Sequence, residues 1–177
     1  MRVLHITNEF TKKNYSIASL ILFISKYLYK SYGVRFSLLS SKTNKFLFRD
    51  EIFTQINFNK WSSFFLLNKE LKKKIYNYDI IHIHGIWAPI QLFSILICNK
   101  QNFNFVVHPH GMLLPEALSS GGIIKYFFKL FSLFFLKKIL KRNLNFISIT
   151  NQETNAIKKY FPKANVNLIS NPIPFHI

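Results

Sequence analysis

Short apolar runs and amphipathic helical segments alternate along most of this chain, and that alternation limits the folds open to it. Residues 2–7 (RVLHIT) form an unbroken apolar and β-branched run, which is typical of a strand buried on both faces. Residues 16–32 then repeat apolar side chains at helical spacing, Gly33 supplies a helix stop, and residues 34–40 (VRFSLLS) predict a second strand. A strand, a helix and a strand in this order predict a βαβ unit, whose strands are parallel.

The same alternation continues to the end of the chain. After an irregular basic stretch at 41–59, the pattern predicts helices over 61–76, 87–99, 122–142 and 152–160, and strands over 79–84, 104–108, 146–149 and 166–169. This order predicts a doubly wound α/β fold, a single Rossmann-like domain with a parallel sheet and helices on both faces. The length of 177 residues and the 49% hydrophobic content suit one domain with its own core.

Polar and titratable residues gather where the predicted strands end. In doubly wound sheets, ligands bind in the crevice outside the carboxyl ends of the strands. The residues predicted at those ends are Thr7, Asn8, Glu9, His84, Gly85, His108, His110, Gly111, Thr150, Asn151, Ser170 and Asn171. Because the strand interiors are Val, Ile, Leu and Phe, this segregation favours a ligand crevice over a purely structural domain.

Two His-x-His pairs stand at the ends of neighbouring predicted strands. Such pairs have the residue type for a zinc site, but no Asp or Glu is close in sequence to orient the ligands, so we expect no metal. His82, inside its strand, is expected to be a core histidine with satisfied nitrogens. His110, between Pro109 and Gly111, is expected on a sharp turn with its ring exposed. It is the candidate catalytic residue, because imidazole exchanges a proton near neutral pH.

Five segments, in a fixed order, carry a resemblance to a known family. They are DIIHIHGIWAP, VVHPHGMLLPEAL, a basic helix, ISITNQET and ISNPIP. Together they resemble the N-terminal domain of family 4 glycosyltransferases of the GT-B type. The resemblance implies transfer of a sugar from a nucleotide-sugar donor, with retention at the anomeric carbon, in the synthesis of lipopolysaccharide or another cell-surface polysaccharide. It also implies that this half holds a glycan or lipid-linked acceptor, while a second domain holds the donor.

The resemblance extends to single residues. His110 corresponds to the family's histidine near the transferred sugar, and Asn171 to the turn where the chain crosses to the second domain. The family's glycine pair after the first strand falls here on Tyr15 and Ser16, and a tyrosine does not allow the same close backbone approach. Glu116 suits a sugar hydroxyl and equally a helix N-terminus. The substrate-binding candidates are Asn8, Glu9, His84, Gly85, Gly111, Met112, Glu116 and Asn171, with the nucleotide sugar as co-substrate and no other cofactor.

The donor-binding domain is expected outside this sequence. Residues 1–177 correspond to the acceptor domain alone, and Ile177 follows the predicted crossing by only a few residues. Three explanations stay open: a fragment of a longer gene, a split enzyme whose donor-binding half is a separate chain, or an independent acceptor-binding module. We expect the isolated chain to transfer no sugar.

Two explanations of the charge of the chain stay open, an anionic partner and AT-rich coding, which favours Lys. There are 24 Lys and Arg against 7 Asp and Glu, a formal net charge of +17, which suits a membrane surface, nucleic acid or nucleotide phosphates. The helix at 123–142 is both basic and aromatic. Its phenylalanines either form core against the sheet or enter a bilayer while its lysines meet anionic lipid. The membrane-contact candidates are Lys125, Phe127, Phe128, Lys129, Phe131, Phe134, Phe135, Lys137 and Lys138.

Nucleic-acid binding is the alternative from another class. Lys69 and Lys72 to Lys74 form a basic cluster, but no zinc-finger, RRM, KH or P-loop signature accompanies it.

Cys98 is the only cysteine, so no intrachain disulfide is possible. The N-terminus does not resemble a signal peptide, and no apolar run is long enough to span a bilayer. We therefore expect a protein that is cytoplasmic or peripheral on the inner face of the cell membrane.

Overall fold

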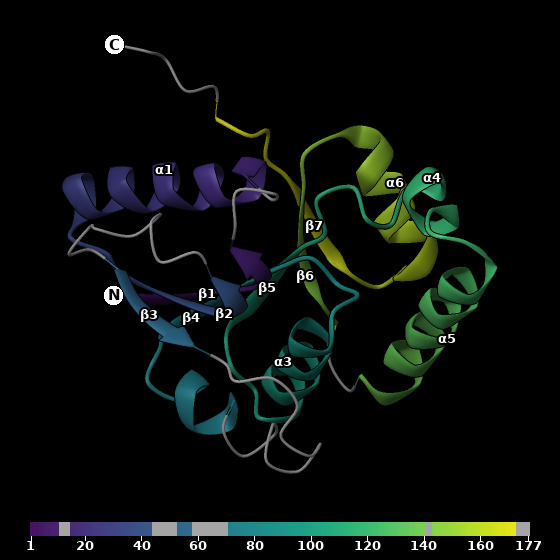
Figure 1. The fold of residues 1–177 in the computed structure, drawn as a ribbon, viewed down its shortest axis with the longest axis horizontal. Coiled ribbons are helices and arrows are strands. Elements are labelled where there is room, and N and C mark those ends of the chain that lie inside the picture. The colour runs from purple at the N-terminus through teal and green to yellow at the C-terminus, as the bar shows by residue number, and fades with distance from the viewer. Residues whose placement is uncertain (11–14, 44–52, 58–70, 141–142, 173–177) are drawn as a thin grey trace.

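Strands and helices alternate along the chain, as the sequence predicts (Figure 1). The computed structural model describes residues 1–10, 15–43, 53–57, 71–140 and 143–172. The strands are β1 (Arg2–Phe10), β2 (Arg35–Thr43), β3 (Phe53–Asn57), β4 (Ile80–His84), β5 (Phe105–His108), β6 (Asn145–Ser148) and β7 (Asn165–Leu168). The helices are α1 (Tyr15–Tyr32), α3 (Pro89–Lys100), α4 (Pro115–Ser119), α5 (Ile123–Ile139) and α6 (Asn151–Tyr160).

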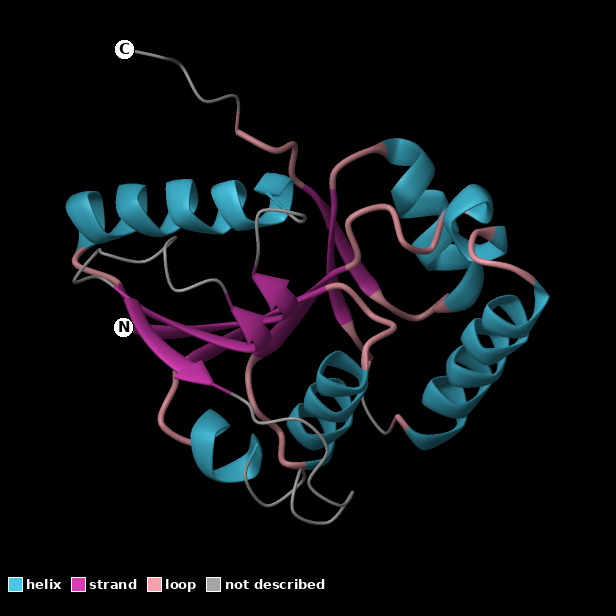
Figure 2. Cartoon of the chain, viewed as in Figure 1, coloured by secondary structure: helices cyan, strands magenta, loops and turns pink. Residues whose placement is uncertain are grey.

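The strands form one parallel sheet in the order β3-β2-β1-β4-β5-β6-β7. The chain builds outward from β1 to β3, then returns to the other side of β1 and continues from β4 to β7. Because parallel crossovers are right-handed, this reversal places α1 on one face of the sheet and α3 on the other (Figures 1 and 2). The strand order therefore reverses between β1 and β4, the position at which such sheets bind ligands.

The core lies between the sheet and its helices. Its centre is formed by side chains of the inner strands that are fully buried, among them Leu4, Ile6, Ile81, Ile83 and Phe146. These strands are apolar at successive positions because helices cover both of their faces. The predicted helix stop is confirmed at Gly33, which has φ +64° and donates its N–H to the carbonyl of Tyr29 at 2.9 Å.

The structure differs from the sequence predictions in three places. Residues 53–57, inside the stretch predicted to be irregular, form the edge strand β3. β1 continues to Phe10, because Glu9 and Phe10 pair with the extended end of β2, so Asn8 and Glu9 lie within a strand and not after it. A short separate helix, α4, precedes α5. In each case pairing or packing with a distant element outweighs weak local preference.

One predicted helix is confirmed only in part, because some of its residues lie outside the described part of the chain. Of the helix predicted over 61–76, residues 71–75 are helical, while 61–70 lie outside the described residues. Tyr15 and Ser16 form the first residues of α1. Within the described part of the chain, no helix combines the length and the hydropathy needed to cross a bilayer.

Candidate functional site

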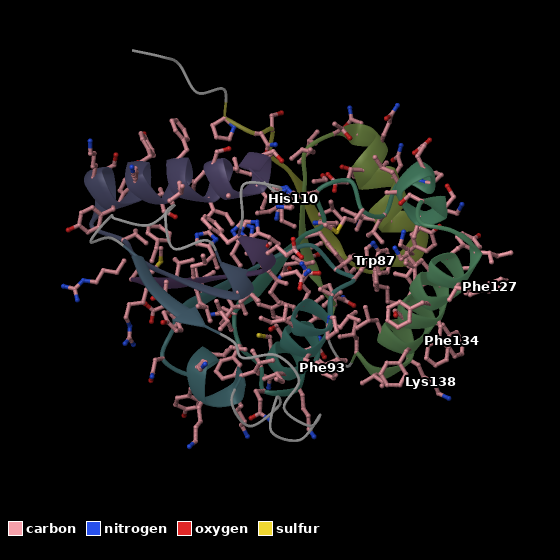
Figure 3. All side chains as sticks on the ribbon, viewed as in Figure 1. Trp87, Phe93, His110, Phe127, Phe134 and Lys138 are labelled. Carbon is pink, nitrogen blue, oxygen red and sulfur yellow. The ribbon has the colours of Figure 1, made fainter. Side chains whose placement is uncertain are left out.

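Five histidines from three adjacent strands and one turn form a continuous cluster. His5 lies on β1 opposite His82 of β4, and His84 at the end of β4 lies opposite His108 of β5. His110 follows β5 and stacks on His108 with the ring centroids 3.7 Å apart. We call these five residues the histidine cluster. It runs from the middle of the sheet to its carboxyl edge, where Figure 3 shows His110.

Hydrogen bonds connect three of these rings in a row. His110 Nε2 lies 2.9 Å from His84 Nδ1, and His84 Nε2 lies 2.9 Å from His5 Nδ1. The Ser25 hydroxyl of α1 lies 3.5 Å from His5 Nε2. A neutral imidazole donates from one nitrogen and accepts at the other, so the tautomer of each ring sets that of the next.

Burial keeps the histidine cluster uncharged. It lowers the pKa of His5 and of His110 to about 3 and that of His108 to about 4, because an imidazolium in these positions would lose its hydration. The pKa values of His82 and His84 are also lowered by burial, with a further contribution from the neighbouring histidines. His110 is thus a neutral hydrogen-bonding group at neutral pH. This burial disfavours the imidazolium that His110 would form if it took up a proton in that range.

A tight turn directs the ring of His110 toward His84. His110 has φ +54° and Gly111 has φ +77°, and the N–H of Met112 donates to the carbonyl of Pro109 at 3.2 Å. These are the features of a type I′ turn, in which both central residues are left-handed. Glycine adopts that conformation freely, whereas for histidine it costs on the order of 1 kcal/mol or more. The surrounding contacts must supply that energy.

A second glycine shapes the end of β4. Gly85 has φ +89°, and its N–H donates to the carbonyl of His108 at 2.8 Å. The side chain of Gln91 packs where a Cβ on Gly85 would lie, and its Nε2 donates to the carbonyl of His84. Because Gly85 has no side chain, Gln91 can approach closely enough to donate to the carbonyl of His84 and fix the backbone at the end of β4.

A buried carboxylate that the sequence analysis missed anchors the turn. Glu153 of α6 is fully buried; its Oε1 accepts from the N–H of Gly111 at 2.6 Å and its Oε2 from the N–H of Ile149 at 2.9 Å. The Thr150 hydroxyl caps α6 by accepting from the N–H of Glu153 at 3.1 Å. The Thr-x-x-Glu spacing signals a helix start in the sequence. It gives no indication that the carboxylate reaches Gly111.

Two nitrogens of the histidine cluster are left without partners. His82 Nε2 and His108 Nε2 are buried, and neither has a hydrogen-bond partner among the residues that the structure describes. The expectation that His82 has satisfied nitrogens is therefore wrong. The ring of His82 stacks on His84 of the same strand and on His108 of the neighbouring strand.

The structure brings together only some of the predicted substrate-binding residues. His84, Gly85, His110, Gly111 and Met112 meet at the carboxyl edge, where the Met112 carbonyl accepts from Trp87 Nε1 at 3.2 Å. Asn8 and Glu9 lie within β1, just beyond Thr7, which pairs with His84, so they also lie at the carboxyl edge. Asn171 is exposed after β7.

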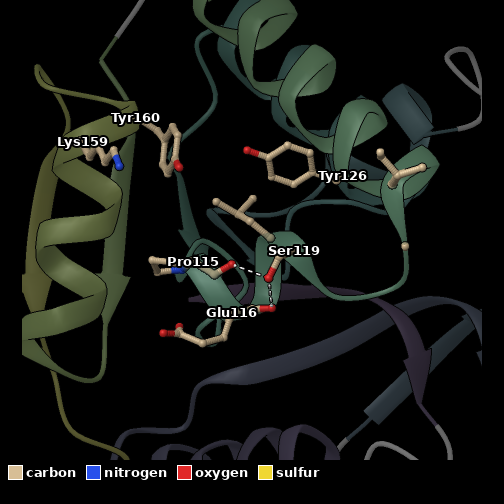
Figure 4. Close-up of a pocket in the computed structure, with 9 residues that line it drawn as sticks. Pro115, Glu116, Ser119, Tyr126, Lys159 and Tyr160 are labelled. Atoms are coloured by element: carbon tan, nitrogen blue, oxygen red, sulfur yellow. Dashed lines mark hydrogen bonds between the residues drawn. The ribbon is translucent and has the colours of Figure 1, made fainter.

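Glu116 lines a pocket that is separate from the histidine cluster and is shown in Figure 4. This open pocket of about 610 Å³ is formed by α4, α5 and α6, and the polar and aromatic residues that line it include Glu116, Ser119, Tyr126, Lys159 and Tyr160. Its described lining contains no member of the histidine cluster.

The aromatic side chains of α5 face outward. Phe127, Phe131 and Phe134 are 61%, 66% and 64% exposed, and Phe128 and Phe135 are also exposed. The buried residues of α5 are Ser132, Leu133 and Leu136. The interpretation of these phenylalanines as core is therefore wrong. Figure 3 shows Phe127 and Phe134 pointing away from the protein, with Lys138 at the same helix.

Lys129 does not belong to this exposed surface. Its side chain is half-buried, and Nζ donates to the carbonyls of Ala117 at 2.6 Å, Leu118 at 3.2 Å and Ser120 at 3.0 Å. These carbonyls lie at the C-terminal end of α4, where a cation is favourable. Lys129 thus fastens α4 to α5, which corrects its assignment as a membrane contact.

Comparisons with known proteins agree with this architecture. The model of the family described as Glycosyltransferase Family 4 matches residues 18–176. Among solved structures, UDP-GlcNAc 2-epimerase from Methanocaldococcus jannaschii superposes with a TM-score of 0.59 at 13% identity, over 97% of this chain and 46% of that one. A putative UDP-N-acetylglucosamine 2-epimerase from Listeria monocytogenes gives a TM-score of 0.55 at 11% identity, over 89% and 41%. The chain thus spans less than half of each epimerase. A search of curated proteins found no significant match.

We predict that Glu153→Gln destabilises the protein by about 1–3 kcal/mol. A glutamine has a single carbonyl oxygen, so it leaves the N–H of Gly111 or of Ile149 without its acceptor. Urea unfolding followed by circular dichroism measures the change. Glu116→Gln is the matched control, because that carboxylate is exposed, and it should change the unfolding free energy by less than about 0.5 kcal/mol. Equal stability of the two variants would contradict the anchoring role.

Proposed function

The chain belongs to glycosyltransferase family 4, and we propose that it is the acceptor-binding half of a GT-B enzyme that moves a sugar, with retention, from a nucleotide sugar to a glycan or lipid-linked acceptor. One observation carries the assignment of the site. A strained turn places a neutral imidazole, His110, at the carboxyl edge of the sheet beside the reversal of strand order. That is where doubly wound folds bind ligands.

His110 is better suited to orienting a hydroxyl group through a hydrogen bond than to accepting its proton. Its Nε2 is held by His84, which leaves Nδ1 as the nitrogen for a sugar or acceptor hydroxyl. Gly111 adds no side chain beside it, and the backbone N–H of Gly111 is already held by Glu153. A ring fixed in position and tautomer aligns a hydroxyl for reaction without itself changing charge. This is a positioning role, with the reacting charge stabilised elsewhere.

The donor half must come from a second domain. The chain spans less than half of two structures whose names identify them as UDP-GlcNAc epimerases, which supports nucleotide-sugar chemistry for the complete protein. We assign the nucleotide sugar to that second domain, supplied in the same or in a separate polypeptide. By itself the described domain binds acceptor and transfers no sugar.

The pocket beside α5 is suited to a part of the acceptor other than the hydroxyl that His110 orients. Its two tyrosines offer faces for a sugar ring, and Glu116, Ser119 and Lys159 offer hydrogen-bonding groups. Tyr126 belongs both to this pocket and to α5, whose phenylalanines are exposed. A saccharide in the pocket would therefore lie next to an apolar surface suited to its lipid. This arrangement fits an acceptor of a cell-surface polysaccharide or lipopolysaccharide pathway.

The exposed face of α5 supports attachment to an anionic membrane on its cytoplasmic side. An exposed contiguous apolar surface of this kind marks an interaction site. The cations Lys125, Lys137 and Lys138 are exposed on the same helix, and the chain as a whole carries +17. Phenylalanines entering the headgroup region and lysines meeting anionic lipid are the two contributions to interfacial helix binding.

We predict that the purified chain binds glycans and not free nucleotide sugar. A glycan array probed with the labelled chain should show selective binding that His110→Asn weakens by about tenfold, since a lost hydrogen bond is worth about 1 kcal/mol. Asparagine tolerates the left-handed turn, so it removes the imidazole at little cost to the fold. Calorimetry with UDP-GlcNAc serves as the donor probe. Tight UDP-GlcNAc binding without glycan binding would contradict the acceptor-half proposal.

We also predict that the chain sediments with anionic vesicles in preference to zwitterionic ones. Changing Phe127, Phe131 and Phe134 together to serine should lower vesicle affinity by at least about tenfold, because each aromatic ring contributes apolar area that leaves water. The matched control is Tyr27→Ser with Tyr32→Ser, two exposed aromatics on α1.

The electrostatic contribution has its own check. Each lysine at an anionic surface is worth about 1 kcal/mol, so Lys137→Gln with Lys138→Gln should reduce the preference for anionic vesicles. Equal recovery of the natural chain with both vesicle types would contradict the electrostatic contribution. Equal loss of binding in the serine variants of α1 and α5 would contradict a specific role for α5.

A further inference from the structure

We propose that His84, His108 and His110 form a binding site for a divalent transition metal ion of the zinc class. One ring nitrogen from each of these histidines lies within 4.8 Å of the other two. The site needs no sugar or nucleotide and would form whether or not the chain is part of a transferase. It replaces the expectation from sequence that the chain holds no metal.

Buried nitrogens without partners point to a missing ligand. Two histidine triads have ring nitrogens close enough for a shared ion: His5 with His82 and His84, and His84 with His108 and His110. Each triad contains one buried Nε2 without a partner among the described residues, on His82 and on His108 respectively. A buried polar atom in that state has lost its hydration without a replacement, which is unfavourable. A coordinated cation would satisfy it.

Access favours the outer triad of His84, His108 and His110. His110 is half-buried and stands on the turn at the carboxyl edge, so an ion has a route from solvent. In the inner triad, the half-buried residue is His82, which lies within β4 and not on a turn, and the Nε2 of His84 is already hydrogen-bonded to His5. The remaining nitrogen of His84, Nδ1, faces His110.

Zinc binding requires the rings to move. Tetrahedral zinc with Zn–N of about 2.1 Å places its nitrogen ligands about 3.4 Å apart. His84 Nδ1 and His110 Nε2 are 2.9 Å apart, so they must separate slightly, and a ring nitrogen of His108 lies within 4.8 Å of both. The rings of His108 and His110 are stacked, so they must tilt out of the stack for their in-plane lone pairs to converge on one ion.

The protons can be rearranged without loss of charge balance. In the metal-bound form His84 keeps its proton on Nε2, donates it to His5 Nδ1, and leaves Nδ1 free for the ion. His5 then donates from Nε2 toward the hydroxyl of Ser25, 3.5 Å away. The proton that His110 Nε2 donates to His84 Nδ1 in the metal-free form moves to His110 Nδ1. Each imidazole stays neutral, and the cation takes the place of that proton between His84 and His110.

His5 and Ser25 therefore supply the outer support that carboxylates often give. Metal-bound histidines usually donate their second N–H to an oriented partner, which fixes the tautomer and the ring. The sequence argument against a metal rested on the lack of a nearby Asp or Glu. In the structure, His5 takes that place for His84, because β1 and β4 are neighbours.

The ligand set selects the class of ion. Three imidazoles without a carboxylate suit Zn²⁺, Ni²⁺ or Cu²⁺, whereas Mg²⁺ and Ca²⁺ require oxygen ligands. Three protein ligands also leave a fourth position open to water or to an atom of a bound molecule, as in zinc sites that bind substrates.

Calorimetric titration of the full chain with zinc chloride, after removal of metal with a chelator, tests the proposal. We expect one equivalent of Zn²⁺ to bind and Mg²⁺ to give no heat. His110→Asn should weaken zinc binding by at least about 100-fold, more than the loss of an outer partner, and His5→Phe by about 10–100-fold. The spectrum of bound Co²⁺ reports a tetrahedral site independently of any variant.

His82→Phe is the matched control, because it removes a histidine of the inner triad and keeps a ring in the stack. Its zinc affinity should equal that of the natural chain. Circular dichroism shows whether each variant is folded, and His108→Gln is a second ligand variant in case His110→Asn is not. Absence of zinc binding to the natural chain, or equal affinity of the folded His110→Asn or His108→Gln chain, would overturn the proposal. Loss of binding in His82→Phe alone would transfer the site to the inner triad.

Discussion

The pairing of β1 with β4 is the contact on which the rest of the structure depends. These strands are separated by most of the first half of the chain, yet they lie side by side at the reversal of strand order. Their register places His5 opposite His82 and Thr7 opposite His84. A shift by one residue would move every one of these side chains to the other face of the sheet. The meeting of His5 with His82 and His84 follows from this register, and the β4–β5 register then adds His108.

The histidine cluster is costly to bury, and the surrounding structure explains how the protein tolerates it. Neutral imidazoles avoid the large penalty for a buried charge, and the row from His110 through His84 to His5 satisfies their nitrogens pairwise. The buried carboxylate of Glu153 accepts from the backbone N–H groups of Gly111 and Ile149. It holds the strained turn of His110 from behind. Polar groups in this part of the molecule thus serve to position one another, which is the arrangement expected of a preorganised binding site.

The periodic pattern of α5 predicts which side chains share a side of the helix, but not which side packs against the protein. At helical spacing, Phe127, Phe128, Phe131, Phe134 and Phe135 fall on one side of the helix. The pattern does not predict whether that side meets the sheet or the solvent, since both arrangements have the same periodicity. In the structure, Ser132, Leu133 and Leu136 form the packed side, and Lys129 bonds to the end of α4. The aromatic side is left exposed, and with the nearby lysines it forms the surface proposed for the membrane.

The sequence by itself determined the alternation of strands and helices, the parallel sheet, the family, and the turn that carries His110. These features depend on residues close to one another in the chain, whose spacing and chemistry are visible in the sequence. Only the tertiary structure decided that five histidines meet, that Glu153 reaches Gly111, that Asn8 and Glu9 lie within β1, and that α5 turns its phenylalanines outward. Each of these depends on strand order, register or packing between distant segments. Such contacts are chosen by the free energy of the whole fold and leave no local pattern in the sequence.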